Sequence, residues 1–190
     1  MIVALDFDGT VADTNFVKSE WIKNNLGLNI PPYQCDRTSC VPIIGIENYN
    51  KMGQDVYSKS HTPNIPIVSG CVEGIAKLKS IGQLFIITAR TGERLLAALE
   101  WLSRYQGTKG LSVIGVDTNL YSKLVKCREN DASVLIDDDE RHLHNSQKFG
   151  IYGILFKNDA PNDFNPKYKN FCTSWIQIYK CLKLIFINKK

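Results

Sequence analysis

The sequence predicts an α/β protein, a doubly wound parallel sheet with a small, mainly helical segment inserted after the first strand. Three observations support this fold class. Apolar runs of strand length recur along the chain, segments with helical spacing lie between most of them, and one interval is far too long for a single crossover. Strands that alternate with helices are typical of a parallel sheet covered on both faces.

The expected strands are continuous apolar runs rather than alternating ones, the pattern of strands buried on both faces. They lie at residues 2–6, 84–88, 112–116, 133–137 and 152–156. Apolar residues between them recur at helical spacing, as Leu95, Leu99 and Leu102 do. These segments predict helices at residues 71–81, 92–105, 119–130 and 139–149.

The interval between the first two strands contains an insertion. A crossover needs about a dozen residues, but residues 7–83 separate these strands. We expect residues 1–14 and 67–190 to form a core domain and residues 15–66 a subdomain. Its first part, residues 15–26, has helical spacing. The aromatic residues of this subdomain either pack its own interior or contact a ligand; they include Trp21, Tyr33, Tyr49 and Tyr57.

The composition indicates a folded domain without a strongly charged partner surface. The chain has 190 residues, of which 44% are hydrophobic, and a formal net charge of +4. Much of the positive charge lies near the C-terminal end. This balance suits an enzyme for anionic substrates and does not require a nucleic acid.

Neither export nor membrane insertion is predicted. The first core strand begins at residue 2, which leaves no room for a signal peptide. The apolar stretch at 175–188 is too short for a membrane span, and Lys180 and Lys183 interrupt it. We expect it to form a last helix or strand over the core, with an amphipathic membrane contact as the alternative.

The six cysteines are therefore expected to be reduced thiols in a cytoplasmic protein. Cys35 and Cys40 with His61 are an alternative zinc site, but their spacing does not match the usual finger patterns.

The chemistry is indicated by Asp6-Phe7-Asp8-Gly9-Thr10, directly after the first apolar run. Alternate residues of a strand point to opposite faces, so the two carboxylates can converge only if the chain turns after Asp6. Gly9 permits such a turn. Ligands of open α/β sheets bind at the carboxyl ends of the strands. A calcium loop would need a third acid and a closing Glu, whereas Phe7 and Val17 occupy those places.

The run Asp137-Asp138-Asp139-Glu140 follows another strand. Neighbouring carboxylates about 4 Å apart repel by about 4 kcal/mol at an effective dielectric of 20. A magnesium ion between Asp6, the backbone carbonyl of Asp8 and this cluster would remove that cost.

Asp-x-Asp-Gly-Thr after an N-terminal apolar strand resembles the first motif of the haloacid-dehalogenase (HAD) superfamily, whose members are mostly phosphatases. The resemblance implies that Asp6 is the nucleophile and Asp8 the general acid and base. It also implies that Asp138 binds Mg²⁺ directly, that Asp137 acts through water or another ligand, and that the insertion is a cap over the site. Phosphate oxygens would be held by the motif loop, by a strand-end hydroxyl with the next backbone N–H, and by a lysine: Gly9, Thr10, Thr88, Ala89 and Lys123, with Lys126 as the competitor of Lys123.

The core segments Phe-Ile-Ile-Thr-Ala-Arg and Leu-Ile-Asp-Asp resemble the branch that contains 5′-nucleotidases and deoxyribonucleotidase-like proteins. This implies a small phosphate ester as substrate, most simply a nucleoside or deoxynucleoside 5′-monophosphate. The expected substrate contacts are Trp21, Tyr33, Tyr49, Tyr57 and Arg90. The alternatives are another small-metabolite phosphatase, a non-catalytic binding module or a nucleic-acid-end phosphatase. The oligomeric state stays open.

Overall fold

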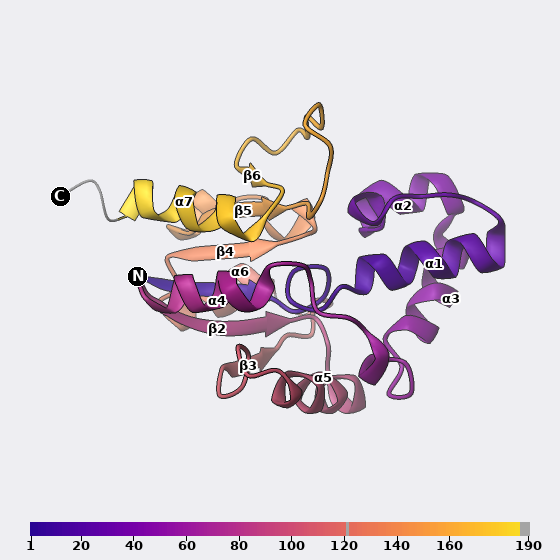
Figure 1. Cartoon of the computed structure of the whole chain (residues 1–190), viewed down its shortest axis with the longest axis horizontal. Coiled ribbons are helices and arrows are strands. Elements are labelled where there is room, and N and C mark those ends of the chain that lie inside the picture. The colour runs from indigo at the N-terminus through magenta and orange to yellow at the C-terminus, as the bar shows by residue number, and fades with distance from the viewer. Residues whose placement is uncertain (121, 187–190) are drawn as a thin grey trace.

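The computed structural model describes residues 1–120 and 122–186 and contains one six-stranded parallel sheet (Figure 1). The strand order is β3-β2-β1-β4-β5-β6, so the first strand lies in the middle. The strands are β1 Ile2–Asp6, β2 Gln83–Thr88, β3 Ser112–Gly115, β4 Val134–Asp137, β5 Tyr152–Phe156 and β6 Phe171–Cys172. The predicted α/β fold class is confirmed.

Helices cover both faces of this sheet, as the continuous apolar strands require. One face packs against α4 Cys71–Lys79, α5 Gly92–Arg104 and α7 Trp175–Phe186, with Trp101 and Trp175 fully buried between the layers. The other face packs against α6 Lys123–Glu129 and the segment that follows β4.

The insertion after β1 is mainly helical and projects beyond the carboxyl ends of the strands (Figure 1). It consists of α1 Thr14–Leu26, α2 Arg37–Ile44 and α3 Ile46–Val56, with short 3₁₀ turns at Pro32–Gln34 and Thr62–Asn64. Asp13 caps α1 by accepting the backbone N–H of Phe16, and Gly27 ends it in the left-handed conformation. A separate apolar cluster holds these helices together, with Ile22 and Met52 at its centre.

Several predicted elements differ from the structure. The helix expected at 139–149 is instead two 3₁₀ turns, Glu140–His142 and Ser146–Phe149, because Asn145 between them has a left-handed backbone (φ 65°). The helix expected at 119–130 begins only at Lys123, where Ser122 caps it. The short strand β6 was not predicted. Of the apolar stretch at 175–188, residues 187 and 188 lie outside the described residues.

No helix formed by residues 1–120 and 122–186 is long and apolar enough to cross a membrane. All six cysteines are free thiols. Two of the three residues of the alternative zinc site contact neighbouring protein atoms. The Sγ of Cys35 lies 3.5 Å from the backbone carbonyl of Pro31, and Nδ1 of His61 contacts the hydroxyl of Ser58.

Candidate active site

The loop after β1 folds back on itself and brings both motif aspartates to one cavity. The backbone N–H of Gly9 donates to the carbonyl of Ala12, and those of Val11 and Ala12 donate to Phe7. Gly9 has φ 76°, and a Cβ there would lie 2.4 Å from a carboxylate oxygen of Asp138. Only glycine fits this position, because both the backbone conformation and the space exclude a side chain.

Asp6 ends β1 and is held by a buried lysine. Nζ of Lys123, at the start of α6, lies 2.8 Å from Oδ1 of Asp6 and 2.7 Å from Oδ2 of Asp137. The same Oδ1 accepts the backbone N–H of Phe7 at 2.7 Å. Both contacts of Asp6 therefore use Oδ1, and Oδ2 makes no hydrogen bond or ion pair within residues 1–120 and 122–186.

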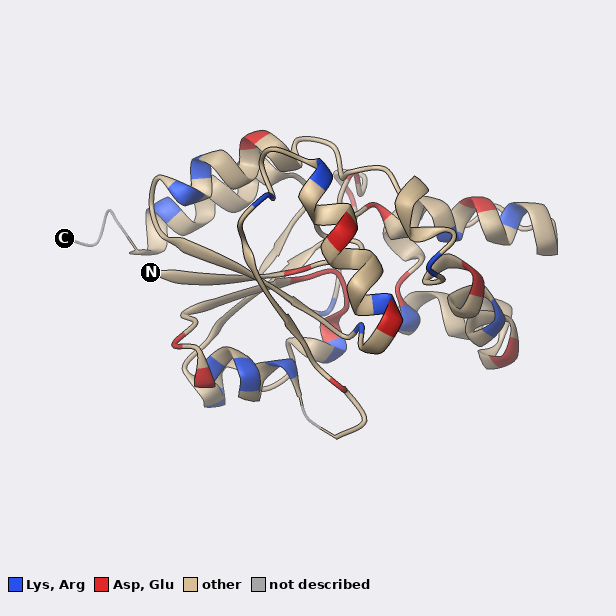
Figure 2. Ribbon diagram, turned by 90° about the horizontal axis from the view of Figure 1, so that it is seen from below, with Lys and Arg blue, Asp and Glu red and all other residues tan. Residues whose placement is uncertain are grey.

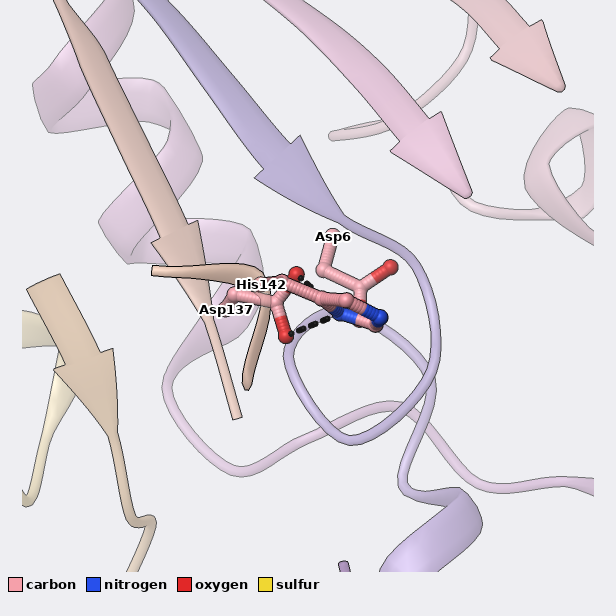
Figure 3. Close-up of side chains that lie close together, drawn as sticks. All are labelled: Asp6, Asp137 and His142. Carbon is pink, nitrogen blue, oxygen red and sulfur yellow. Dashed lines mark hydrogen bonds and ion pairs between the residues drawn. The ribbon is translucent and has the colours of Figure 1, made fainter. Parts of the chain in front are cut away.

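Asp137, at the end of β4, makes further contacts that fix its charge. It accepts the backbone N–H of Asp139 at 3.0 Å, and Nδ1 of His142 lies 3.1 Å from both of its oxygens (Figure 3). Burial favours the neutral acid, but Lys123 and His142 outweigh it and hold the pKa of Asp137 far below its usual range. No sequence pattern indicates a role for His142, because it lies in the 3₁₀ turn Glu140–His142, where the spacing predicts a helix.

The pKa of Asp6 is raised well above its usual value, chiefly by burial and then by the nearby charge of Asp137. Burial, together with the charge of Asp137, also raises the pKa of Asp138 to about 6, although Lys18 opposes the shift. Figure 2 shows acidic residues on the loops between the sheet and the insertion. A bound cation would lower all these pKa values, so the cluster is suited to a metal.

The donor set fits magnesium better in one arrangement than in another. Ligand atoms of Asp6, Asp137 and His142 lie within 4.8 Å of one another. However, the ammonium of Lys123 already pairs with both carboxylates there, and Mg²⁺ prefers oxygen to imidazole nitrogen. Asp138 offers a better ligand: it is buried, and the side-chain amide of Asn15 holds its Oδ2 at 2.7 Å. The set of Asp6, the Asp8 carbonyl and Asp138 has the oxygen chemistry that Mg²⁺ prefers and stays a prediction, while Asp137 pairs with Lys123.

Asp8 is paired with Arg90, a contact that the sequence did not predict. Nε and Nη2 of Arg90 lie 2.9 and 2.7 Å from the two carboxylate oxygens of Asp8. The remaining nitrogen, Nη1, donates to the hydroxyl of Thr62 at 2.7 Å. Arg90 is buried between the rings of Phe7 and Tyr57. Arg90, which was expected to contact the substrate, thus orients Asp8, the expected general acid and base.

The residues predicted to contact phosphate differ in whether they line the cavity or are buried beside it. Ala89 and Lys123 line the cavity together with Asp6, Asp8 and Asp138. The hydroxyl of Thr88 is fully buried and accepts the backbone N–H of Arg90 at 3.2 Å, which leaves its own proton to donate. The hydroxyl of Thr10 is buried without a hydrogen-bond partner among the described residues.

The cavity has a volume of about 750 Å³ and extends from Asp6 to the insertion. Tyr49 and Tyr57 line it, as expected. Trp21 and Tyr33 do not: the indole N–H of Trp21 donates to Asp55 at 2.8 Å, and the ring of Tyr33 packs edge-on against Phe164 at 5.3 Å. These two rings stabilise the structure around the site.

Cations contact both tyrosine rings of the cavity. Nζ of Lys18 lies 5.9 Å from the Tyr49 centroid and 5.5 Å from that of Tyr57. Arg37 lies 5.6 Å from the Tyr49 ring, and Arg90 lies 5.1 Å from the Tyr57 ring. Ring surface that could stack on a nucleobase is therefore partly occupied.

No family model matches the sequence, and no curated protein matches it. Solved structures do match the fold. A HAD family hydrolase from Deinococcus radiodurans R1, with bound phosphate and sodium, aligns with TM-score 0.65 and 10% identity over 96% of this chain and 95% of that one.

Two further structures agree. A haloacid dehalogenase-like hydrolase from Streptococcus pneumoniae gives TM-score 0.61 at 12% identity, over 95% of this chain and 97% of that one. A protein from Lactobacillus plantarum, provisionally assigned as a phosphoglycolate phosphatase, gives 0.62 at 16% identity, over 94% and 97%. The chain therefore has the fold of HAD hydrolases.

Proposed function

We propose that this chain is a magnesium-dependent phosphomonoesterase for small phosphate esters. The main observation in support of this proposal is that Asp6 and Asp8, at the end of the central strand, line one cavity of about 750 Å³. Asp6 is fixed by Lys123, and Asp8 is fixed by Arg90. The shared fold with HAD hydrolases supports the same activity.

The residues divide the reaction into two steps. A carboxylate oxygen of Asp6 attacks phosphorus, the ester bond breaks, and Asp8 gives its proton to the departing alcohol. Asp8 then takes a proton from water, which attacks the aspartyl-phosphate and restores Asp6 with release of phosphate. Arg90 keeps the carboxyl group of Asp8 oriented in both steps. When bound, Mg²⁺ would supply positive charge that shields the phosphate from the nucleophile.

The test is hydrolysis of p-nitrophenyl phosphate with Mg²⁺, with and without EDTA. We expect EDTA to stop turnover, and Asp6→Asn to abolish it while the circular dichroism spectrum is unchanged. The exposed Asp163→Asn serves as the matched control and should retain full activity. An Asp6→Asn variant that keeps more than a few per cent of the activity would falsify the mechanism. A non-catalytic module would show no turnover, and it would have no reason to bind phosphate in a magnesium-linked way in calorimetry.

We also propose a nucleoside 5′-monophosphate as the first substrate to test. The resemblance of the core segments supports it, and Tyr49 and Tyr57 supply aromatic surface in the cavity. The panel compares dUMP, dTMP, AMP and GMP with sugar phosphates and 2-phosphoglycolate by kcat/KM. If no nucleotide exceeds the best of the other esters, the nucleotidase assignment fails and the phosphatase proposal stands.

Six free thiols support a reducing, cytoplasmic location.

A further inference from the structure

The wall of the cavity that belongs to the insertion carries positive charge that the protein does not neutralise. On the core side, three cations have a carboxylate partner within 2.8 Å: Lys123 with Asp6, Arg90 with Asp8 and Arg141 with Asp139. Arg94, which also lines the cavity from the core, is exposed to solvent and forms no ion pair within residues 1–120 and 122–186. On the insertion side the charged residues that line the cavity are Lys18 of α1, Arg37 of α2 and Asp36, whose carboxylate pairs with Lys157. Neither Lys18 nor Arg37 forms an ion pair within residues 1–120 and 122–186.

Lys18 is the more informative of the two, because its side chain is only 3% exposed. Its Nζ donates to the side-chain carbonyl of Asn15 at 3.1 Å and lies against the two tyrosine rings. A buried ammonium is unfavourable unless it is paired. Besides the two rings, Lys18 has only the amide oxygen of Asn15 and the more distant charge of Asp138 to offset this cost, without an ion pair to either. Folding alone therefore does not explain a lysine here.

Arg37 extends the same positive region toward solvent. Its guanidinium and the ammonium of Lys18 both contact the ring of Tyr49, at 5.6 and 5.9 Å from the centroid. Arg37 is half-buried. The two cations thus gather around one ring in the part of the cavity that the insertion lines.

We propose that the substrate carries a second anionic group on its leaving alcohol, and that Lys18 and Arg37 bind this group. This inference rests on the proposed phosphatase activity and specifies its substrate class: a nucleoside monophosphate without a second anion would be a poorer substrate than an ester that carries one. The second anion is a carboxylate or a further phosphate, because either would pair with an ammonium and a guanidinium. Its binding would complete the charge pairing that the protein leaves open.

Matched pairs of esters test this inference. For the carboxylate, 3-phosphoglycerate is compared with glycerol 3-phosphate; for the phosphate, adenosine 3′,5′-bisphosphate is compared with AMP. In wild-type protein we expect kcat/KM to be about tenfold higher or more for the doubly anionic member of at least one pair, since a charged hydrogen bond supplies that discrimination. The same pairs are titrated calorimetrically into Asp6→Asn, so that binding is measured without turnover.

Lys18→Gln and Arg37→Gln should each remove most of this advantage by raising KM for the doubly anionic ester, with less than a threefold change for its partner. Lys77→Gln is the matched control, because Lys77 also lies over a tyrosine ring (Tyr179, 5.5 Å) but in the contact of α4 with α7. Lys77→Gln should leave the advantage unchanged. Arg37 is partly exposed, so Arg37→Gln is expected to fold and tests the subsite even if Lys18→Gln does not fold.

Three results would overturn the inference. The first is equal kcat/KM within both pairs while p-nitrophenyl phosphate is hydrolysed, which leaves the phosphatase proposal intact. The second is an equal loss for both members in Lys18→Gln with no effect of Arg37→Gln, which would make Lys18 a positioning residue for Asn15 and Asp138. The third is equal affinity within both pairs in calorimetry. Absence of all hydrolysis would instead contradict the phosphatase proposal, and calorimetry would still decide the anion subsite.

Discussion

Lys123 is the residue on which the folded charge arrangement depends most. Its ammonium is 1% exposed and lies within 2.8 Å of two buried carboxylates. Burial lowers the pKa of Lys123, but the charges of Asp137 and Asp6 outweigh it and raise the pKa far above the usual value. The two carboxylates therefore hold Lys123 in its charged form.

Lys123→Met should lower the free energy of unfolding by about 3–5 kcal/mol at pH 7, because two buried carboxylates lose their shared cation. Urea denaturation measures this change. Arg104→Met is the control: its ion pair with Glu100 is exposed, so we expect a cost of at most about 1 kcal/mol. Similar losses in the two variants would show that the buried pair contributes no more than a surface pair.

Residues of the candidate site differ in how well the sequence predicts their contacts. Asp6 and Asp8 were recognisable because their chemistry is local: two acids, a turn and a strand in one short motif. The contact of Asp8 with Arg90 joins residues 82 positions apart, and no spacing rule predicts it. The assigned roles of the site residues stay predictions.

At the scale of elements, the strands were predictable and the turns were not. All five expected strands, β1 to β5, lie within a residue of their expected positions. Strands buried on both faces leave a continuous apolar run, which β1, β2, β4 and β5 show. The segment at 139–149 lacks such a pattern, and its two turns are set by contacts such as that of His142 with Asp137. The two-residue strand β6 is too short to leave a pattern of its own.

The contact between α4 and α7 depends on the absence of a side chain at Gly74. A Cβ at this position would lie 2.6 Å from the ring of Trp175, which is buried. Gly74→Ala should therefore destabilise the protein by about 1–3 kcal/mol, although alanine is the better helix former.

Gly53→Ala in α3 is the matched control, because its Cβ would lie 3.5 Å from the ring of Tyr57, an ordinary contact. There we expect a gain of about 0.5–1 kcal/mol from helix propensity alone. Urea denaturation of both variants gives the comparison. A gain in both would mean that α7 moves aside without cost.

At the scale of the whole molecule, the insertion and the core are joined by polar contacts across the cavity. Nζ of Lys157, after β5, lies 2.5 Å from Oδ2 of Asp36, and the hydroxyl of Thr38 donates to Asp139 at 3.3 Å. The insertion itself was predictable from the length of the first interval. The contacts that hold the insertion against the core were not predictable, because each of these two joins residues more than 100 positions apart.

The buried thiols predict how the whole molecule responds to alkaline pH. Burial raises the pKa of Cys127 and of Cys172 to about 12, and it raises that of Cys71 further. An unfolded thiol loses its proton near pH 8.5. Because the folded pKa values are higher, the folded state keeps protons that the unfolded state releases. The stability that these thiols contribute is therefore fully present below about pH 8.5 and is lost as the pH rises toward 12.

The expected loss is about 1.4 kcal/mol for each thiol and each pH unit above that point, or about 2 kcal/mol per thiol by pH 10. Urea denaturation at pH 8 and pH 10, in the presence of a reductant, measures it. A variant with Cys71→Ala, Cys127→Ala and Cys172→Ala starts from a lower stability, because it leaves small cavities in the core. Its further loss between the two pH values should nevertheless be much smaller than that of the wild-type protein. An equal loss in both proteins would assign the alkaline response to other groups and contradict the thiol explanation.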